Sequence, residues 1–227
     1  MRQAFVGVLL FAGLVTGATP VAGAARDATA TLRIVIVDAA GTPVTSLAFL
    51  RRELARLLRD AGVEPRFRAV KAGTETASGE LPVVLLASTG LGADRGRRLA
   101  GTTGWAGAGP AIWIYCPNVV GGVGLRESQA LGAAEHQRTV GLALARVAAH
   151  EVVHALAPDL VHRDRGLMRP RLAPADLLGG GEALEADVAA ALGAGAREFG
   201  SRGAAWWTEL RLKAATAAAG ESDTAVR

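Results

Sequence analysis

Cysteine, tyrosine and histidine are scarce in this sequence, and the cysteine shortage already limits how the fold is held together. The 227 residues contain one cysteine, Cys116, so a disulfide within the chain is excluded. The fold must therefore rest on packing and, where ligands for one exist, on a metal ion. Cys116 lies in an apolar stretch, and we expect a buried core thiol because free cysteine is among the most buried residue types.

Charge of one sign is not concentrated anywhere along the chain. The 25 basic residues exceed the 21 acidic ones only slightly, and lysine occurs only at Lys71 and Lys213. The arginines form small clusters, and no stripe combines them with stacking aromatic residues, which make up 4% of the chain. This distribution argues against a nucleic-acid partner.

The first 24 residues predict a secretory signal peptide. Arg2 supplies the charged start, an apolar run extends from Ala4 to about Ala18, and Ala22-Gly23-Ala24 is a cleavage site of the A-x-A type. An uncleaved N-terminal anchor is the alternative, but the run of roughly fifteen residues is short for a membrane span. We expect an exported protein, periplasmic or extracellular, with no stable membrane association after cleavage.

The remainder of the chain predicts one α+β domain over residues 25–219, followed by a disordered tail at 220–227. We expect a small mixed sheet of about four strands packed on a long helix and followed by C-terminal helices. The predicted strands are 31–37, 65–70, 81–87 and 111–116, and the predicted helices are 46–60, 133–156, 182–199 and 206–219. Residues 91–109 are expected to form a Gly-rich loop, and the strand at 111–116 to lie at the sheet edge, because prolines flank it. An N-terminal subdomain of about 31–157 would precede a C-terminal part of about 158–219.

The most informative pattern is His150-Glu151-Val152-Val153-His154, near the end of the long predicted helix. The chain has only four histidines, and three of them fall between positions 150 and 162. Residues four apart on a helix lie about 40° apart around its axis, so both imidazoles of the pentapeptide can reach one metal ion. Glu151 is rotated by about 100° from His150, which allows it to act on water beside the metal without binding the metal itself.

A catalytic zinc site normally takes three protein ligands, so a third must come from elsewhere. His136 is excluded because fourteen residues of helix place it about 21 Å from His150. His162 follows the helix after a stop at Pro158 and can return to the metal. A carboxylate is the alternative, on the next helix or in the loop, and its candidates are Glu182, Glu185, Asp159 and Asp164. Alternatively, Asp159 and Asp164 could accept a hydrogen bond from the ring N–H of a histidine that binds the metal.

The residues after His162 carry a family resemblance. Gly166-Leu167-Met168-Arg169-Pro170 puts a methionine six residues after that histidine, in a turn marked by glycine and proline. This resembles the metzincin zinc peptidases, whose HExxHxxGxxH signature is followed by a methionine turn. Here the third histidine is the twelfth residue after the first instead of the tenth, and Ala157 stands at the glycine position. HExxH, seven residues, His and then Gly-Leu-Met-Arg is similar to a group of exported bacterial metzincin-like proteins.

The resemblance covers the architecture of about residues 31–178 and is specific in its motif from His150 to Pro170. It implies a zincin/metzincin-like fold and a secreted zinc metalloendopeptidase that hydrolyses a peptide or protein substrate with a zinc-bound water activated by glutamate. It implies the following roles: Zn2+ ligands His150, His154 and His162, catalytic base Glu151, and hydrophobic floor Met168.

Two other functions stay open from the sequence. The chain could be an exported zinc-binding or peptide-binding domain with weak or no catalysis, since no group that stabilises a transition state is identifiable beside Glu151. Alternatively, HEVVH could be an ordinary helical segment of a domain without metal. The clustering of three histidines with Met168 disfavours this second alternative.

Overall fold

The computed structural model describes residues 29–91, 98–106, 109–125, 132–179, 184–203, 205 and 208–209. The predicted signal peptide, the candidate ligand Glu182 and the tail at 220–227 lie outside the described residues. The helix predicted at 206–219 also lies outside them, except for Thr208 and Glu209.

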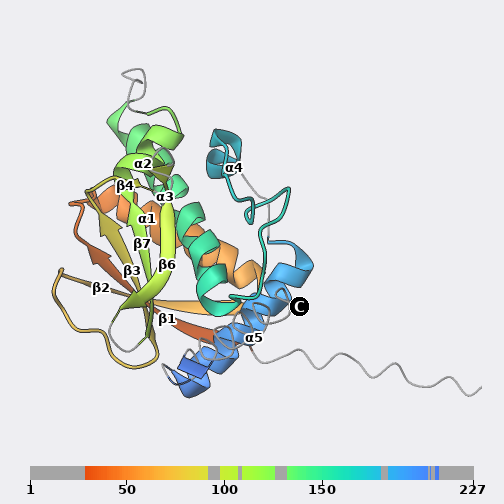
Figure 1. Cartoon of the computed structure of the whole chain (residues 1–227). Coiled ribbons are helices and arrows are strands. Elements are labelled where there is room, and N and C mark those ends of the chain that lie inside the picture. The colour runs from red at the N-terminus through yellow and green to blue at the C-terminus, as the bar shows by residue number, and fades with distance from the viewer. Residues whose placement is uncertain are drawn as a thin grey trace, which may run out of the picture.

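Five strands form the main sheet, in the order β2-β1-β3-β7-β6 (Figure 1). Four are parallel: β2 (Val63–Val70), β1 (Ala30–Asp38), β3 (Glu80–Leu86) and β7 (Gly109–Tyr115). The fifth, β6 (Gly101–Ala106), is antiparallel to β7 and forms one edge. Two short strands, β4 (Gly90–Leu91) and β5 (Arg98–Leu99), pair separately. The fold is thus a mixed one, with a sheet that is mostly parallel.

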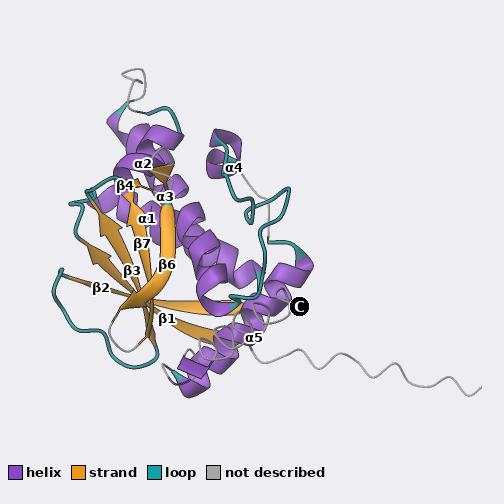
Figure 2. Ribbon diagram, viewed as in Figure 1, coloured by secondary structure: helices purple, strands orange, loops and turns teal. Residues whose placement is uncertain are grey.

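The helices lie together beside this sheet (Figure 2). They are α1 (Val44–Asp60), α2 (Cys116–Gly122), α3 (Ala133–Leu156), α4 (Pro174–Leu178) and α5 (Ala186–Arg202). Helix α3 has the bounds expected for the long helix, 133–156. Helix α5 begins four residues after the start expected for the helix at 182–199 and ends three residues after its expected end.

The core lies between the sheet and the helices. Leu32, Ile34 and Ile36 of β1 are buried and share one face of the sheet, because alternate strand residues point to the same side. They share one apolar cluster with residues from α1, α3 and α5. Helix α3 is long and apolar enough to cross a membrane, but 89% of its most apolar window is buried inside the protein, as in a core helix.

The predicted edge strand is not at the edge. Strand β7 lies between β3 and β6, so the prediction from its flanking prolines was wrong. Pairing with β3 begins at Ile112, which leaves Pro110 at the strand start, where its missing N–H breaks no bond to β3. Pro117 lies in the first turn of α2, outside the strand. Neither proline therefore interrupts the pairing of β7 with β3.

The sheet has one strand more than expected, because part of the predicted Gly-rich loop at 91–109 forms β6. The sequence GTTGWA contains two glycines, which are depleted in strands, and these glycines hide the strand from a local prediction. Tertiary contacts explain those glycines. A Cβ on Gly104 would lie 2.9 Å from the Trp113 ring on β7. At Gly104, strand β6 therefore packs closely against β7, which leaves no room for a side chain.

Candidate metal centre

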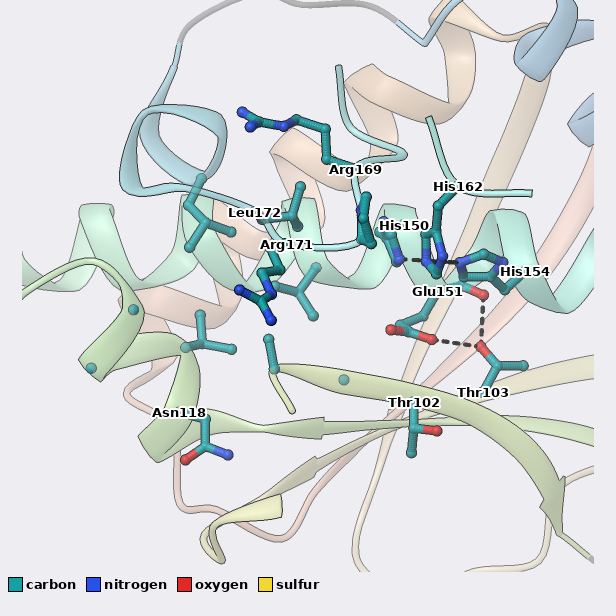
Figure 3. Close-up of a pocket in the computed structure, with 18 residues that line it drawn as sticks. Thr102, Thr103, Asn118, His150, Glu151, His154, His162, Arg169, Arg171 and Leu172 are labelled. Atoms are coloured by element: carbon teal, nitrogen blue, oxygen red, sulfur yellow. Dashed lines mark hydrogen bonds between the residues drawn. The ribbon is translucent and has the colours of Figure 1, made fainter. Parts of the chain in front are cut away.

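Helix α3 and the segment after it bring three histidines together. His150 and His154 lie one turn apart in the last two turns of α3, which ends at Leu156, two residues before Pro158. His162 lies on the irregular segment that follows. Its ring returns to the helix end, so the three imidazoles face one another (Figure 3).

The spacing of the three imidazoles fits one metal ion. Nε2 of His154 lies 3.1 Å from Nε2 of His150 and 3.1 Å from Nε2 of His162. A ligand nitrogen can be chosen from each ring so that all three lie within 4.8 Å of one another. Zn–N bonds of about 2.0–2.1 Å at tetrahedral angles place two ligand nitrogens about 3.3 Å apart. The donor set therefore matches a zinc ion in both chemistry and spacing.

A backbone carbonyl orients the first of these rings. Nδ1 of His150 donates to the carbonyl oxygen of Leu167 over 2.8 Å, inside the protein. In a neutral imidazole this leaves Nε2 without a proton and directs its lone pair at the other two histidines. The group that supports His150 is thus a backbone carbonyl. It is not Asp159 or Asp164, both of which are exposed. Sequence reasoning missed this contact because a carbonyl has no sequence signature.

A short closed loop holds both His162 and the methionine in place. The backbone N–H of Arg163 donates to the carbonyl of Met168 over 2.8 Å, which closes the turn between them. Gly166 has a φ of 66° within this loop, a conformation that costs other residues more than glycine. The Met168 side chain is 2% exposed and belongs to the core cluster. The turn therefore links His162 to the core through Met168 and to His150 through Leu167.

Burial keeps the helix histidines in the neutral form that binds metals. Desolvation and the neighbouring rings of His150 and His162 lower the pKa of His154 to about 4. Desolvation also lowers the pKa of His150, although the Leu167 carbonyl opposes the effect. At neutral pH both imidazoles are therefore uncharged, and each has a lone pair for a cation.

A threonine on the edge strand β6 contacts Glu151 and holds it in place. Oγ1 of Thr103, on β6, lies 2.9 Å from Oε2 of Glu151 and 2.9 Å from its backbone oxygen. Gly101 lies beside the same side chain, where an added Cβ would stand 2.9 Å from Cγ of Glu151. The glycine therefore allows β6 to approach α3 closely. Neither Thr103 nor Gly101 was identified from the sequence, because they lie in the segment expected to be a loop.

Burial changes the acidity of Glu151. Desolvation raises its pKa to about 7, while the hydrogen bond from Thr103 acts in the opposite direction. A carboxyl group whose pKa lies near neutrality can both accept and release a proton under ordinary conditions. Such a shift beside three converging imidazoles is typical of a functional site.

These groups lie in a cleft of about 730 Å³ between α3, β6, α2 and the segment before α4. Figure 3 shows the imidazoles at one end of this cleft, with Glu151 and Thr103 next to them. The edge strand contributes Gly101, Thr102 and Thr103 to the lining, and the opposite wall includes Arg169, Arg171 and Leu172. The cleft is thus long enough to extend well beyond the metal centre.

The other candidates lie elsewhere among the described residues. His136 lines a separate small pocket together with Cys116. Glu185 makes an ion pair with Arg165 instead of joining the histidines. Cys116 was expected in a buried strand, but it begins α2 and is only partly buried, because β7 ends one residue earlier.

Comparison with solved structures finds a similarity of the backbone, while the two sequence comparisons find none. No family model matches the chain, and no curated protein matches its sequence at a significant level. The backbone is similar to the crystal structure of archaemetzincin from Methanopyrus kandleri, with a TM-score of 0.48 and 11% sequence identity. The alignment covers 73% of this chain and 95% of that one. The function proposed below rests on the geometry of the site itself.

Proposed function

We propose that this chain is an exported, metzincin-like zinc metallopeptidase, with Zn2+ bound by His150, His154 and His162. One observation carries the proposal. Three imidazole nitrogens converge, and the carboxylate of Glu151, next to His150 in sequence, lies in the same cleft. Met168 contributes as part of the buried turn that holds His162, which is how the metzincin-like floor would act here.

The chemistry divides between the metal and the protein. A bound zinc ion supplies Lewis acidity, which makes water more acidic and polarises the carbonyl of a peptide bond. Glu151 accepts the proton of the attacking water on its carboxylate and delivers it to the departing amine. Thr103 keeps this carboxylate oriented during both transfers, and the Leu167 carbonyl keeps the His150 ring in its ligating tautomer.

The free edge of β6 is the surface that best fits a peptide substrate. Among the described strands, β6 pairs only with β7, and three of its residues line the cleft beside Glu151. An extended peptide can add to such an edge through main-chain hydrogen bonds. We therefore expect a peptide to bind along residues 101–106, and not along 111–116, where the sheet edge was expected.

Glu151→Gln tests the mechanism. The amide keeps the size of the side chain but cannot accept the proton, so kcat/KM on peptides should fall by at least about a hundredfold. Zinc content, measured by elemental analysis, should stay near one ion per chain. Glu198→Gln, an exposed position on α5, is the matched control and should keep wild-type activity. Wild-type turnover by Glu151→Gln would refute the mechanism.

A peptide library separates the peptidase from the alternative function, a zinc-binding exported domain that binds peptides without cleaving them. Zinc-loaded protein should release new amino termini from the library, and Glu151→Gln should not. If the wild-type protein binds library peptides but cleaves none, the binding domain is the correct assignment.

Export is proposed from the sequence of residues 1–24. The full chain, expressed in a bacterial host, should appear outside the cytoplasm with Ala25 as its amino terminus. Amino-terminal sequencing of the fractionated protein checks this. Retention of residues 1–24 in the membrane fraction would instead identify an anchor.

A further inference from the structure

The cleft is lined by a positively charged side chain, that of Arg171, which the proposed catalysis does not use. Arg171 lines the cleft together with His150 and Glu151, and it is exposed. Figure 3 shows its side chain reaching into the cleft from the segment before α4. Among the residues that the structure describes, no carboxylate pairs with Arg171. An arginine presented to a cleft in this way is available to a ligand.

The other arginine of this wall has a structural role. Nη1 of Arg169 lies 3.1 Å from Oδ2 of Asp176, which also accepts the backbone N–H of Ala173 over 2.7 Å. The buried Arg146 of α3 donates to the backbone carbonyl of Asp176 over 3.0 Å. Asp176 therefore neutralises Arg169 and attaches the wall to α3. Arg171, between Arg169 and Ala173, stands on a segment held at both ends.

The surroundings of Arg171 favour an anion. Glu151 is the one carboxylate among the described residues that line the cleft, and Asp176 already balances Arg169. The wall around Arg171 is mostly apolar, with Leu172, Leu177 and Val119 in the lining. A planar guanidinium binds a carboxylate through two parallel hydrogen bonds.

We infer that Arg171 is a specificity-determining residue that binds a carboxylate of the substrate beside the metal centre. The inference rests on the proposed peptidase function and names its substrate class: peptides with an acidic group near the bond to be cleaved. Two sources supply that group, an aspartate or glutamate side chain and the free carboxylate of a peptide C-terminus. Because the segment is anchored on both sides of Arg171, binding of the carboxylate mainly has to order the Arg171 side chain.

The first experiment compares matched peptides on the zinc-loaded protein. Peptides with amidated ends carry Glu or Gln at one position at a time, and a second set carries Gln throughout with a free or an amidated C-terminus. At one position, or at the free end, kcat/KM should be about tenfold higher for the carboxylate, as for a hydrogen bond to a charged group. The arm that shows the preference identifies the source of the carboxylate.

Two variants connect the preference to Arg171. In Arg171→Gln the carboxylate-to-amide ratio should fall to about one, and in Arg171→Glu it should fall below one, with lysine peptides gaining. Arg197→Gln removes the same charge from an exposed position on α5 and should keep the wild-type ratio. A wild-type ratio within twofold in every arm, or a ratio that survives in Arg171→Gln, would overturn the inference.

A binding measurement separates this inference from the peptidase function. Fluorescence polarisation on zinc-loaded Glu151→Gln protein reports affinity without turnover. It compares labelled Glu with Gln peptides, and peptides with a free C-terminus with amidated ones. If the wild-type protein cleaves nothing, the peptidase proposal fails, while a tenfold preference in binding that is lost with Arg171→Gln still supports the carboxylate subsite. Equal binding of carboxylate and amide forms in both comparisons, or no binding of any peptide, overturns the subsite even where cleavage occurs.

Discussion

The hydroxyl of Thr103 lies within 2.9 Å of both the carboxylate and the backbone oxygen of Glu151, a residue 48 positions later in the chain. A hydroxyl has one hydrogen, so it donates to one of these oxygens at a time. In either arrangement the contact fixes the edge strand β6 against α3. It therefore sets both the direction of the carboxylate and the width of the cleft at the metal centre.

Thr103→Val should lower peptidase activity while the protein stays folded. Valine keeps the branched shape but cannot donate to Glu151, so we expect kcat/KM to fall by about tenfold, the value of one hydrogen bond to a charged group. Thr103→Ser restores the hydroxyl and should recover most of the activity. Steady-state kinetics on one peptide check both variants, and equal activity in Thr103→Val and the wild type would exclude the orienting role.

Gly101→Ala should damage both stability and activity. The added methyl group would lie 2.9 Å from Cγ of Glu151 and 2.9 Å from Cγ1 of Val147, so the strand or the side chains must move. Overpacking of this kind costs about 1–3 kcal/mol in the free energy of unfolding.

Gly200→Ala is the control for this substitution. Gly200 lies on helix α5, and a Cβ there would contact only the carbonyl oxygen of Thr31, 3.6 Å away. Denaturant unfolding should show a loss for Gly101→Ala alone, and an unchanged midpoint for it would contradict the close packing of β6 on α3.

Zinc should stabilise the protein through His162 and not through Glu185. Zinc at a hundred times its dissociation constant should add about 2.7 kcal/mol to the free energy of unfolding, and a chelator should remove this gain. His162→Ala removes one of three ligands, so the zinc affinity should fall by more than the roughly tenfold to hundredfold loss typical of a supporting residue.

Glu185→Gln is the matched test of the downstream carboxylate. Glu185 makes an ion pair with Arg165, 3.1 Å away, and this substitution should leave the zinc affinity unchanged. Zinc titration with a competing chromophoric chelator measures both variants. The opposite result, with Glu185→Gln losing zinc and His162→Ala keeping it, would assign the third ligand to the carboxylate.

Cys116 should react slowly with alkylating reagents below pH 10. Burial, with a smaller contribution from the charge of Asp38, raises the pKa of its thiol to about 11. Only the thiolate reacts, so at pH 8 about one thiol in a thousand is reactive, against about one in ten for a thiol with the ordinary pKa of 9.0. The rate of iodoacetamide labelling, followed by mass spectrometry, should rise about tenfold for each pH unit.

Urea-unfolded protein is the reference for this labelling. Its single thiol should react about a hundredfold faster at pH 8 than in the folded protein. Equal rates at pH 8 in the folded and unfolded protein would show that Cys116 is freely accessible and has an ordinary pKa.

Local patterns predicted the elements whose stability comes from their own residues. The helix at 133–156 could be bounded from sequence because it starts polar, becomes mostly apolar in its second half, and is stopped by Pro158. Buried strands such as β1 and β3 were visible as short β-branched runs. Strand β6 was not, because its glycines are explained by contacts with Trp113 and Glu151, which no local pattern contains.

The sequence by itself determined that His150 and His154 share one helix face with Glu151 beside them, because helical geometry alone relates residues one and four apart. Only the tertiary structure decided that His162 returns to them, that the Leu167 carbonyl orients His150, and that Thr103 reaches Glu151. These contacts join segments 8 to 48 residues apart through an irregular loop and a sheet edge. Their distances depend on how β6, α3 and the loop pack together, which no spacing along the chain expresses.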